Sequence, residues 1–263
     1  MAEAEIRFSD GAAYERFMGR WSRAVGIDVL DWVAPPQAAR WLDVGCGTGA
    51  FTELVLRRCT PASIVAVDPS PDQIGYVRQQ PIAARADFRV ADAQALPFPD
   101  AAFDVVASAL VINFIPDRRK GIGEMRRVGR PGAILAGYVW DFANGRGTAW
   151  PLIAGMTDIG MEVPRVPGTE DSTLEALGAL AAGAGLTEVA TRAFDASMTY
   201  PDFDDYWRSQ TPSFSPMGRA IAALPDPRRA QLRDAIRAIL PASADGRVSY
   251  RARANAVKAR VPG

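Results

Sequence analysis

The sequence predicts an α/β protein whose centre is a doubly wound, mostly parallel sheet of seven strands. Two observations favour this class. Short apolar runs alternate with amphipathic, helix-like segments from residue 40 onward, and several of these runs end at an aspartate. With 263 residues, 48% of them apolar and 23% charged, the chain has a globular composition. Its length fits one large domain or two small ones, and we expect a single domain over 1–263.

The first 36 residues predict an N-terminal helical cap. Apolar side chains recur at helical spacing over residues 12–34, and Pro35 and Pro36 end the pattern. Two glycines interrupt the stretch, so one long helix and two short ones both fit.

Residues 37–141 predict the core of the sheet. Five apolar runs occur here, and helix-like segments follow most of them, including a charged one at 117–129. The runs are RWLDV, SIVAVD, DFRVADA, FDVVASALVINFI and GAILAGYVWD. This alternation favours parallel strands with helices on both faces.

The second half of the chain is less regular. Residues 142–170 indicate a loop-rich excursion, 173–184 a helix, and 200–246 a mixture of aromatic, proline-containing and amphipathic helical segments. We expect 142–185 and 200–246 to be insertions on the substrate side of the core. Two more strands are predicted in this half. They are LTEVATRAF and SYRARANAVKARV, and the second alternates small or aromatic residues with arginines, as a strand with one buried face does.

A glycine loop after the first strand is the centre of the predicted site. Gly45, Gly47 and Gly49 are spaced G-x-G-x-G, where glycine permits a tight turn and a close ligand approach. The loop leads into a helix N-terminus, whose N–H groups attract partial negative charge. Asp68 ends the next predicted strand and Asp92 the third. Because strand carboxyl ends line the ligand crevice of an open sheet, these groups should converge on one nucleoside-like ligand.

The charges around the glycine loop and at the strand ends limit the kind of ligand that this site could bind. The loop is not the dinucleotide pattern G-x-G-x-x-G, and no basic residue follows it up to Glu53. Aspartates end three consecutive strands, at Asp43, Asp68 and Asp92, so the crevice repels phosphates and suits a cationic centre. Asp43 itself either braces the loop amides or contacts the ligand.

Composition excludes other chemistries. Histidine is absent and only Cys46 and Cys59 are available as thiols, so histidine triads and histidine metal clusters are excluded and no metal site is expected. Thirty basic residues balance thirty acidic ones, which gives no bulk field toward nucleic acid or anionic lipid. The basic excess in the last forty residues indicates a solvated face, with a nucleic-acid patch as the minor alternative. Without a spanning run or a signal-peptide pattern, we expect a cytoplasmic protein.

Four motifs, in order, resemble the class I S-adenosylmethionine-dependent methyltransferases. They are LDVGCGTG, VDPSPDQI, ADAQALPFPDAAFDVV and ALVINFIPD. The subgroup they are most similar to contains small-molecule enzymes like the ubiquinone and menaquinone biosynthesis methyltransferases. The resemblance covers about half of the chain, residues 12–141. It implies a Rossmann-like methyltransferase fold, S-adenosylmethionine as cofactor and S-adenosylhomocysteine as product.

The resemblance also implies roles for single residues. Gly45 and Gly47 match the glycines that pack against the methionine portion of the cofactor. Asp68 matches the acid on the ribose hydroxyls. Asp92 matches the acid that accepts from the adenine amino group, and the Ala93 amide lies beside it on the ring.

Three further residues are assigned to the cofactor by the same resemblance. Asn113 falls in the segment under the sulfonium, although it could instead cap the following turn. The segment YERFMGRWS resembles a helix that closes over the cofactor. Within it Arg20 is the candidate partner of the cofactor carboxylate, assisted by Tyr14, because a guanidinium holds a carboxylate through two hydrogen bonds. The alternative for Arg20 is a solvated helix position.

The implied reaction is in-line transfer of the methyl group to a small organic acceptor at oxygen, nitrogen or carbon. Positioning and water exclusion are then the main tasks of the protein. Asp141, at the end of the fifth strand, is the candidate base for an acceptor that arrives protonated. Aromatic side chains in the two insertions could cover the acceptor, or only bury the insertions against the sheet. They are Phe142, Trp150, Tyr200, Phe203, Tyr206, Trp207 and Phe214.

Two other function classes stay open at this point. One is a cofactor-binding partner or regulatory protein without catalysis, and the other is a nicotinamide-dependent oxidoreductase. The expected partner is a small-molecule acceptor, and both a monomer and a homodimer are compatible with the sequence.

Overall fold

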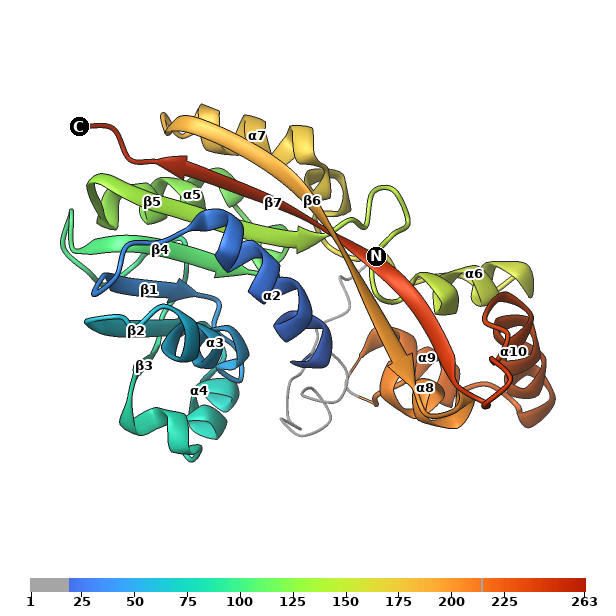
Figure 1. The fold of residues 1–263 in the computed structure, drawn as a ribbon. Helices are drawn as coiled ribbons and strands as arrows, with labels where there is room; N and C mark the ends of the chain where they lie inside the picture. Colours follow the sequence, from blue (N-terminus) through green and yellow to red (C-terminus); the bar gives the residue numbers. More distant parts are fainter. Residues whose placement is uncertain (1–18, 214) are drawn as a thin grey trace.

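The computed structural model describes residues 19–213 and 215–263. Seven strands form one sheet within these residues: β1 (Arg40–Val44), β2 (Ser63–Asp68), β3 (Asp87–Val90), β4 (Phe103–Ala109), β5 (Gly129–Trp140), β6 (Thr187–Tyr200) and β7 (Val248–Arg260). Their spatial order is β3-β2-β1-β4-β5-β7-β6, and every pairing is parallel except the two that β7 makes (Figure 1). The predicted doubly wound, mostly parallel sheet is confirmed.

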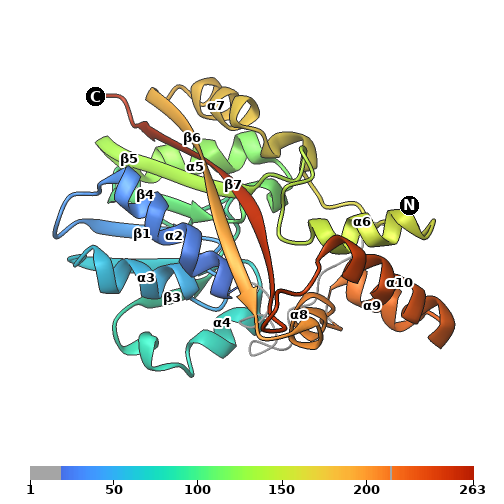
Figure 2. The ribbon, with the colours of Figure 1, turned by 45° about the vertical axis from the view of Figure 1, so that its right-hand side comes forward.

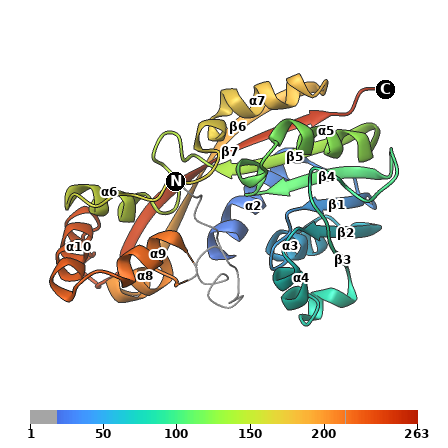
Figure 3. The same cartoon turned by 180° about the vertical axis from the view of Figure 1, so that it is seen from behind.

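Helices cover both faces of the sheet, as Figures 1 and 3 show from opposite sides. α2 (Arg20–Val33) and α3 (Ala50–Arg58) lie on one face, and α5 (Arg118–Val128) and α7 (Leu174–Gly183) lie on the other. The central strands β1 and β4 are therefore buried along nearly their whole length, which explains their continuous apolar sequences. A short helix, α4 (Pro71–Val77), follows β2.

The described part of the predicted N-terminal cap is helical. α2 buries a stripe of Trp21, Val25 and Val29 at a spacing of four residues, as one face of a helix does. It ends at Val33, and its C-cap Ala34 has a left-handed backbone directly before the two prolines. Tyr14 and the rest of residues 1–18 lie outside the described residues.

β6 and β7 continue beyond the edge of the sheet as a two-stranded antiparallel ribbon, from the pair Asp195–Arg253 to the pair Tyr200–Val248 (Figure 2). This segment, the β6–β7 ribbon, reaches a group of helices formed by the two insertions. They are α6 (Trp150–Asp158), α8 (Phe203–Gln210), α9 (Pro216–Ala222) and α10 (Asp226–Ile239). α6 and α10 pack closely, since a Cβ at Gly155 would lie 2.5 Å from Ile236 Cγ1.

Several predicted boundaries differ from the structure, among them the end of the fourth apolar run, since β4 stops at Ala109 and a 3₁₀ turn follows at Ile112–Phe114. The stretch 142–170, expected to be loop, contains α6, whose Pro151 stands in the first turn, where a missing N–H leaves no helical bond unmade. β6 runs on to Tyr200, beyond the predicted end at residue 194, because β7 pairs with it over that length. β3 ends at Val90, so Asp92 follows the strand by two residues. No described helix is both long enough and apolar enough to span a membrane.

Candidate functional site

The glycine loop lies at the carboxyl edge of the sheet, where the strand order reverses between β1 and β4. Gly45, Gly47 and Gly49 have φ angles of +81°, +54° and +86°, a backbone that side chains disfavour. α3 begins at Ala50, directly after the loop. Ligands of doubly wound sheets bind at such a reversal, so the loop stands at the position expected for a ligand contact.

Asp68 ties this loop to the end of β2. Its Oδ2 accepts a hydrogen bond of 2.9 Å from the Gly47 N–H, and its Oδ1 accepts one of 2.9 Å from the Ser70 N–H. Burial raises the pKa of Asp68, and the two amide hydrogen bonds oppose that shift. Each carboxylate oxygen can accept more than one bond, so Asp68 can hold the loop and still accept from a sugar hydroxyl.

Val111 packs against Gly45, a contact that the sequence analysis did not identify. A Cβ on Gly45 would lie 2.4 Å from Val111 Cγ1. The preceding residue, Leu110, has a φ of +63°, and its N–H donates to the Tyr138 carbonyl at 2.7 Å. A non-glycine residue with a left-handed backbone is strained, and such residues cluster at functional sites. The exit of β4 therefore belongs to the candidate site.

Asp92 and Ala93 lie on the same edge as Asp68, because the Ala91 N–H donates to the Asp68 carbonyl at 3.1 Å. The Asp92 side chain is exposed, and its Oδ1 accepts from the backbone N–H of Gln94 at 2.9 Å and from its Nε2 at 3.1 Å. Within the described part of the chain the Ala93 N–H has no acceptor, so it is available to a ligand.

Asp43 does not brace the loop amides, which corrects one of its two expected roles. Its Oδ2 accepts from Thr52 Oγ1 on α3 at 2.6 Å, whereas the loop amides donate to the Val67 carbonyl and to Asp68. The carboxyl is fully buried. Burial raises the pKa of Asp43 to about 7, against the hydrogen bond from Thr52 and with help from the charge of Asp68.

The two residues between the glycines behave differently. Thr48 Oγ1 is buried and has no hydrogen-bond partner in residues 19–213 and 215–263. Since buried polar atoms are normally satisfied, this hydroxyl is a further candidate ligand contact that the sequence analysis missed. Burial and the charges of Asp43 and Asp68 raise the pKa of the Cys46 thiol, which disfavours a reactive thiolate.

Asn113 lies in a short 3₁₀ turn, η3 (Ile112–Phe114), after β4. Its Nδ2 donates to the Pro167 carbonyl at 3.1 Å, and its buried Oδ1 has no described partner. The next helix is capped by Asp117 rather than by Asn113. Asn113 thus joins the exit of β4 to the insertion 142–185, and its contact with the cofactor stays a prediction.

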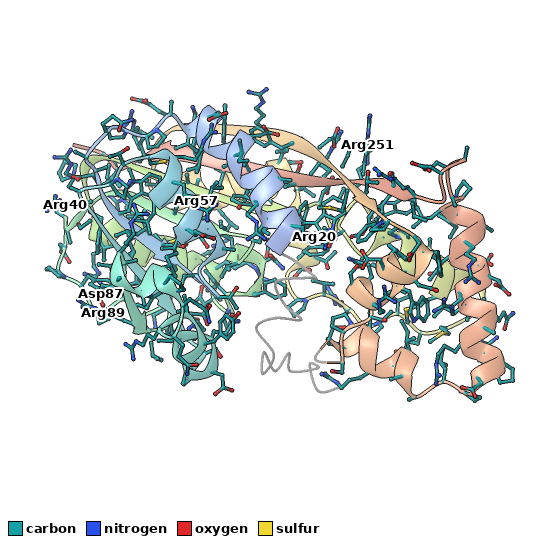
Figure 4. The ribbon with its side chains drawn as sticks, turned by 60° about the horizontal axis from the view of Figure 1, so that its bottom comes forward. Arg20, Arg40, Arg57, Asp87, Arg89 and Arg251 are labelled. Carbon is teal, nitrogen blue, oxygen red and sulfur yellow. The ribbon has the colours of Figure 1, made fainter. Side chains whose placement is uncertain are left out.

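Arg20 begins α2 and faces α8. Its Nη1 lies 3.6 Å from Asp205 Oδ2, and its side chain is 47% exposed. Figure 4 shows Arg20 at the end of α2, near the insertion helices. The ion pair places Arg20 between the core and the second insertion, and its role toward the cofactor carboxylate stays a prediction.

A buried aromatic cluster joins α2 to α8 and to the β6–β7 ribbon. Trp21 Nε1 and Gln210 Nε2 each donate to the Tyr200 hydroxyl at 3.2 Å. The Trp21 ring lies 5.9 Å from the ring of Trp140, the last residue of β5. The cluster therefore meets the same sheet edge as the glycine loop, and part of the aromatic content of the insertions serves packing.

Two buried polar atoms in this cluster have no described partner. They are the Tyr206 hydroxyl and Gln210 Oε1, which stand one turn apart on α8 in side chains 0% and 1% exposed. Burial, with a smaller effect of Tyr200, raises the pKa of Tyr206 well above its usual range, so its hydroxyl stays a neutral donor. The Tyr206 hydroxyl is thus available as a hydrogen-bond donor, and Gln210 Oε1 is available as an acceptor. Phe214 lies outside the described residues.

Asp141 follows β5 directly and is buried. Its Oδ1 accepts from Asn144 Nδ2 at 2.8 Å, and its N–H donates to the Arg253 carbonyl at 2.9 Å. Oδ2 has no described hydrogen-bond donor. The arrangement leaves one oxygen able to accept a proton, and the role of Asp141 as a base stays a prediction.

Comparison with known proteins gives the class. Residues 42–137 match the family model described as a methyltransferase domain. A putative methyltransferase from Bacillus halodurans has the same fold, with a TM-score of 0.57, 16% identity, and coverage of 90% of this chain and 99% of that one. The chain therefore has the Rossmann-like α/β fold of the class I methyltransferases, and its residues 42–137 are similar to their methyltransferase domain.

Within that class it is similar to the ubiquinone and menaquinone biosynthesis C-methyltransferases. The enzyme UbiE of Geobacter sulfurreducens is 36% identical over 118 residues, which cover 43% of this chain and 44% of the relative. A malonyl-[acyl-carrier protein] O-methyltransferase from Serratia marcescens is 28% identical over 165 residues, 58% of this chain and 62% of that protein. The chain thus spans about half the length of these curated relatives.

Proposed function

We propose that this protein transfers a methyl group from S-adenosylmethionine to a small organic acceptor. The observation that carries the proposal is the hydrogen bond between the Gly47 amide and the Asp68 carboxylate. It fixes a left-handed glycine loop beside an acid at the position where doubly wound sheets bind nucleosides. The methyltransferase-domain match over residues 42–137 includes both groups.

The available polar atoms fit this cofactor. Asp68 would accept from the ribose hydroxyls, Asp92 and the free Ala93 N–H would face the adenine, and the unpartnered Thr48 hydroxyl offers a further bond. Gly45 would lie against the methionine portion, with Val111 behind it. When bound, the cofactor supplies a methyl group activated on a positively charged sulfur.

The residues of the chain then have two tasks, to orient the acceptor and to exclude water. The aromatic cluster around Trp21 and Tyr200 would give an apolar or flat acceptor an aromatic wall, since it reaches Trp140 at the carboxyl end of β5. The open donor of Tyr206 and acceptor of Gln210 could hold a polar group of that molecule. For an acceptor that arrives protonated, Asp141 Oδ2 is the proposed proton acceptor.

Binding and turnover are tested separately. Calorimetry with S-adenosylhomocysteine, NAD and NADP should show saturable binding of the first alone. Methyl-labelled S-adenosylmethionine, incubated with the protein and a metabolite extract, should then give a labelled small molecule. Binding without any labelled product would indicate a non-catalytic binding protein, and tight NAD binding would overturn the assignment in favour of an oxidoreductase.

A further inference from the structure

The β6–β7 ribbon has two different faces. Tyr250 points to the buried face, where its ring lies 5.1 Å from that of Trp21. Ser249, Arg251 and Arg253 alternate with it and therefore belong to the opposite, outer face. Figure 4 shows the Arg251 side chain projecting away from the molecule, whereas Arg20 lies on the side of α2.

A groove of about 440 Å³ runs along this outer face. The turn at residues 145–150 forms one wall, and the end of α10 with Leu240 forms another. The volume is within the range of small-ligand sites, roughly 300–1,000 Å³. Tyr250 borders both the groove and the aromatic cluster, but none of the residues of the glycine loop lines the groove, and neither Asp68 nor Asp92 does, so it is distinct from the candidate cofactor site.

The groove carries an excess of positive charge. Three arginines, Arg146, Arg251 and Arg253, line it together with one acid, Asp195. Arg253 pairs with both oxygens of Asp195, at 2.7 and 2.9 Å. The hydrogen bonds from Arg253 lower the pKa of Asp195. Partial burial opposes this shift, and the charges of the three arginines assist it, so Asp195 stays ionised and paired with Arg253.

Arg146 and Arg251 are the two arginines of the groove that do not pair with Asp195. In the described part of the chain neither guanidinium has a hydrogen bond or an ion pair, and both side chains are exposed. Together these two arginines carry a charge of about +2, and Asp195, the acid that lines the groove, is already paired with Arg253. Guanidinium groups present planar pairs of donors that match the oxygens of a carboxylate or a phosphate.

The remaining wall of the groove is apolar. Ile239, Leu240 and the indole of Trp150 line it. The indole is held in place, because Trp150 Nε1 donates to the Arg251 carbonyl at 2.8 Å and the ring packs at 6.2 Å against Tyr250. A bound molecule would thus meet two cations at one side and a fixed aromatic and aliphatic surface at the other.

We infer that this groove is a second ligand site, which binds an oxyanion, carboxylate or phosphate, attached to an apolar or aromatic body. The anionic group contacts Arg146 and Arg251, and the body packs on Trp150 and Leu240. The groove contains none of the residues proposed to bind the cofactor, and binding there does not depend on methyl transfer.

The test uses the full chain and four probes: phenyl phosphate, benzoate, inorganic phosphate and the uncharged benzyl alcohol. The readout is the indole N–H signal of Trp150 in two-dimensional NMR, assigned with Trp150→Phe. Phenyl phosphate or benzoate should shift this signal saturably, and benzyl alcohol should not. Which of the two anions binds more tightly tells whether the natural ligand is a phosphate ester or a carboxylic acid.

Variants locate the binding. The double variant Arg146→Ala/Arg251→Ala should weaken binding at least about tenfold, because each charge-assisted contact contributes about that factor. Arg119→Ala removes an exposed arginine of α5 that makes no described contact, and it should bind like the wild type. Should the double variant fail to fold, Arg251→Glu tests the same charge. Melting curves and S-adenosylhomocysteine binding, both expected to be unchanged, separate this site from the proposed cofactor site.

Three outcomes would overturn the inference. The first is no saturable shift with either organic anion at millimolar concentration. The second is equal affinity of the wild type and the double variant. The third is inorganic phosphate binding as tightly as phenyl phosphate, which would show that the apolar wall contributes nothing.

Discussion

The Gly47 amide donates to Asp68 Oδ2 at 2.9 Å, so the loop after β1 and the end of β2 are held as one unit. The same carboxylate also accepts from the Ser70 amide, at the start of α4. One side chain thus fixes the backbone on both sides of the expected ribose position. A change at Asp68 should consequently affect both folding and binding.

Asp68→Ala should weaken binding of S-adenosylhomocysteine roughly 5- to 150-fold, the equivalent of about 1–3 kcal/mol for hydrogen bonds to a charged group. It should also lower the melting temperature, because two amides lose their acceptor. Calorimetry and thermal unfolding measure the two effects. Asp87→Ala is the matched control, since this exposed acid begins the neighbouring strand and pairs, among the described residues, only with Arg89. Unchanged affinity in Asp68→Ala would show that the ribose lies elsewhere.

Gly45→Ala and Gly75→Ala should change stability in opposite directions. At Gly45 the φ is +81° and a Cβ would lie 2.4 Å from Val111, so the free energy of unfolding should fall by roughly 2–4 kcal/mol. At Gly75, inside α4, nothing lies within 4 Å of a Cβ, and alanine should stabilise by about 0.5–1 kcal/mol. Urea unfolding measures both, and equal midpoints would refute the described packing of Val111 on the loop.

Asp43 should make stability depend on pH. Its folded pKa, about 7, lies above its ordinary value of 3.8, so the folded state holds the proton more tightly. The stabilisation that the folded protein gains from protonated Asp43 is complete below pH 3.8, and it is lost as the pH rises toward and through 7. Asp43→Asn does not titrate, and its stability relative to the wild type should rise by roughly 4 kcal/mol over this window, at about 1.36 kcal/mol per pH unit. Urea unfolding at a series of pH values measures the difference.

Asp104→Asn is a control for that experiment, because the stability contributed by Asp104 should change with pH in the opposite direction. Burial raises the pKa of Asp104, but hydrogen bonds from Arg40 and the charge of Arg130 outweigh it and lower the pKa overall. Its stabilisation is therefore present above the ordinary pKa of 3.8 and is lost as the pH falls through the folded value. A difference between Asp43→Asn and the wild type that stays constant with pH would contradict the burial of an ionisable Asp43.

Tyr206→Phe and Tyr200→Phe separate an unused hydroxyl from a used one. Tyr206 loses no described hydrogen bond, so its replacement should leave the free energy of unfolding unchanged or slightly raised. Tyr200→Phe deprives Trp21 Nε1 and Gln210 Nε2 of their acceptor and should cost about 1–3 kcal/mol. Denaturant unfolding compares them, and a large loss in Tyr206→Phe would reveal a partner for its hydroxyl.

Arg20→Ala tests the predicted contact with the cofactor carboxylate. Its ion pair with Asp205 is partly exposed and should contribute less than about 1 kcal/mol to folding. A true carboxylate contact should instead appear as weaker S-adenosylhomocysteine binding at nearly constant melting temperature. Normal binding with a lower melting temperature would leave Arg20 with a structural role.

Much of the core of the sheet could be predicted from the sequence, because the patterns that indicate its strands and turns involve residues close together in the chain. Each apolar run between residues 40 and 141 is followed by its own turn or helix start, and the glycine loop needs only its three left-handed positions. α6 was missed because its proline and glycine also suit a loop, and only its packing on α10 favours the helix. The length of β6 was missed because strand length depends on the partner strand.

The order of the elements, the glycine loop, the acids at the strand ends and the class of fold were determined by the sequence itself, because propensity and periodicity act between near neighbours. Only the tertiary structure decided that Val111 lies on Gly45, that Trp21 donates to Tyr200 across 179 positions, and that Arg146 and Arg251 share one groove. Such contacts join residues far apart in the chain, and their free energy exists only once the sheet has brought those residues together.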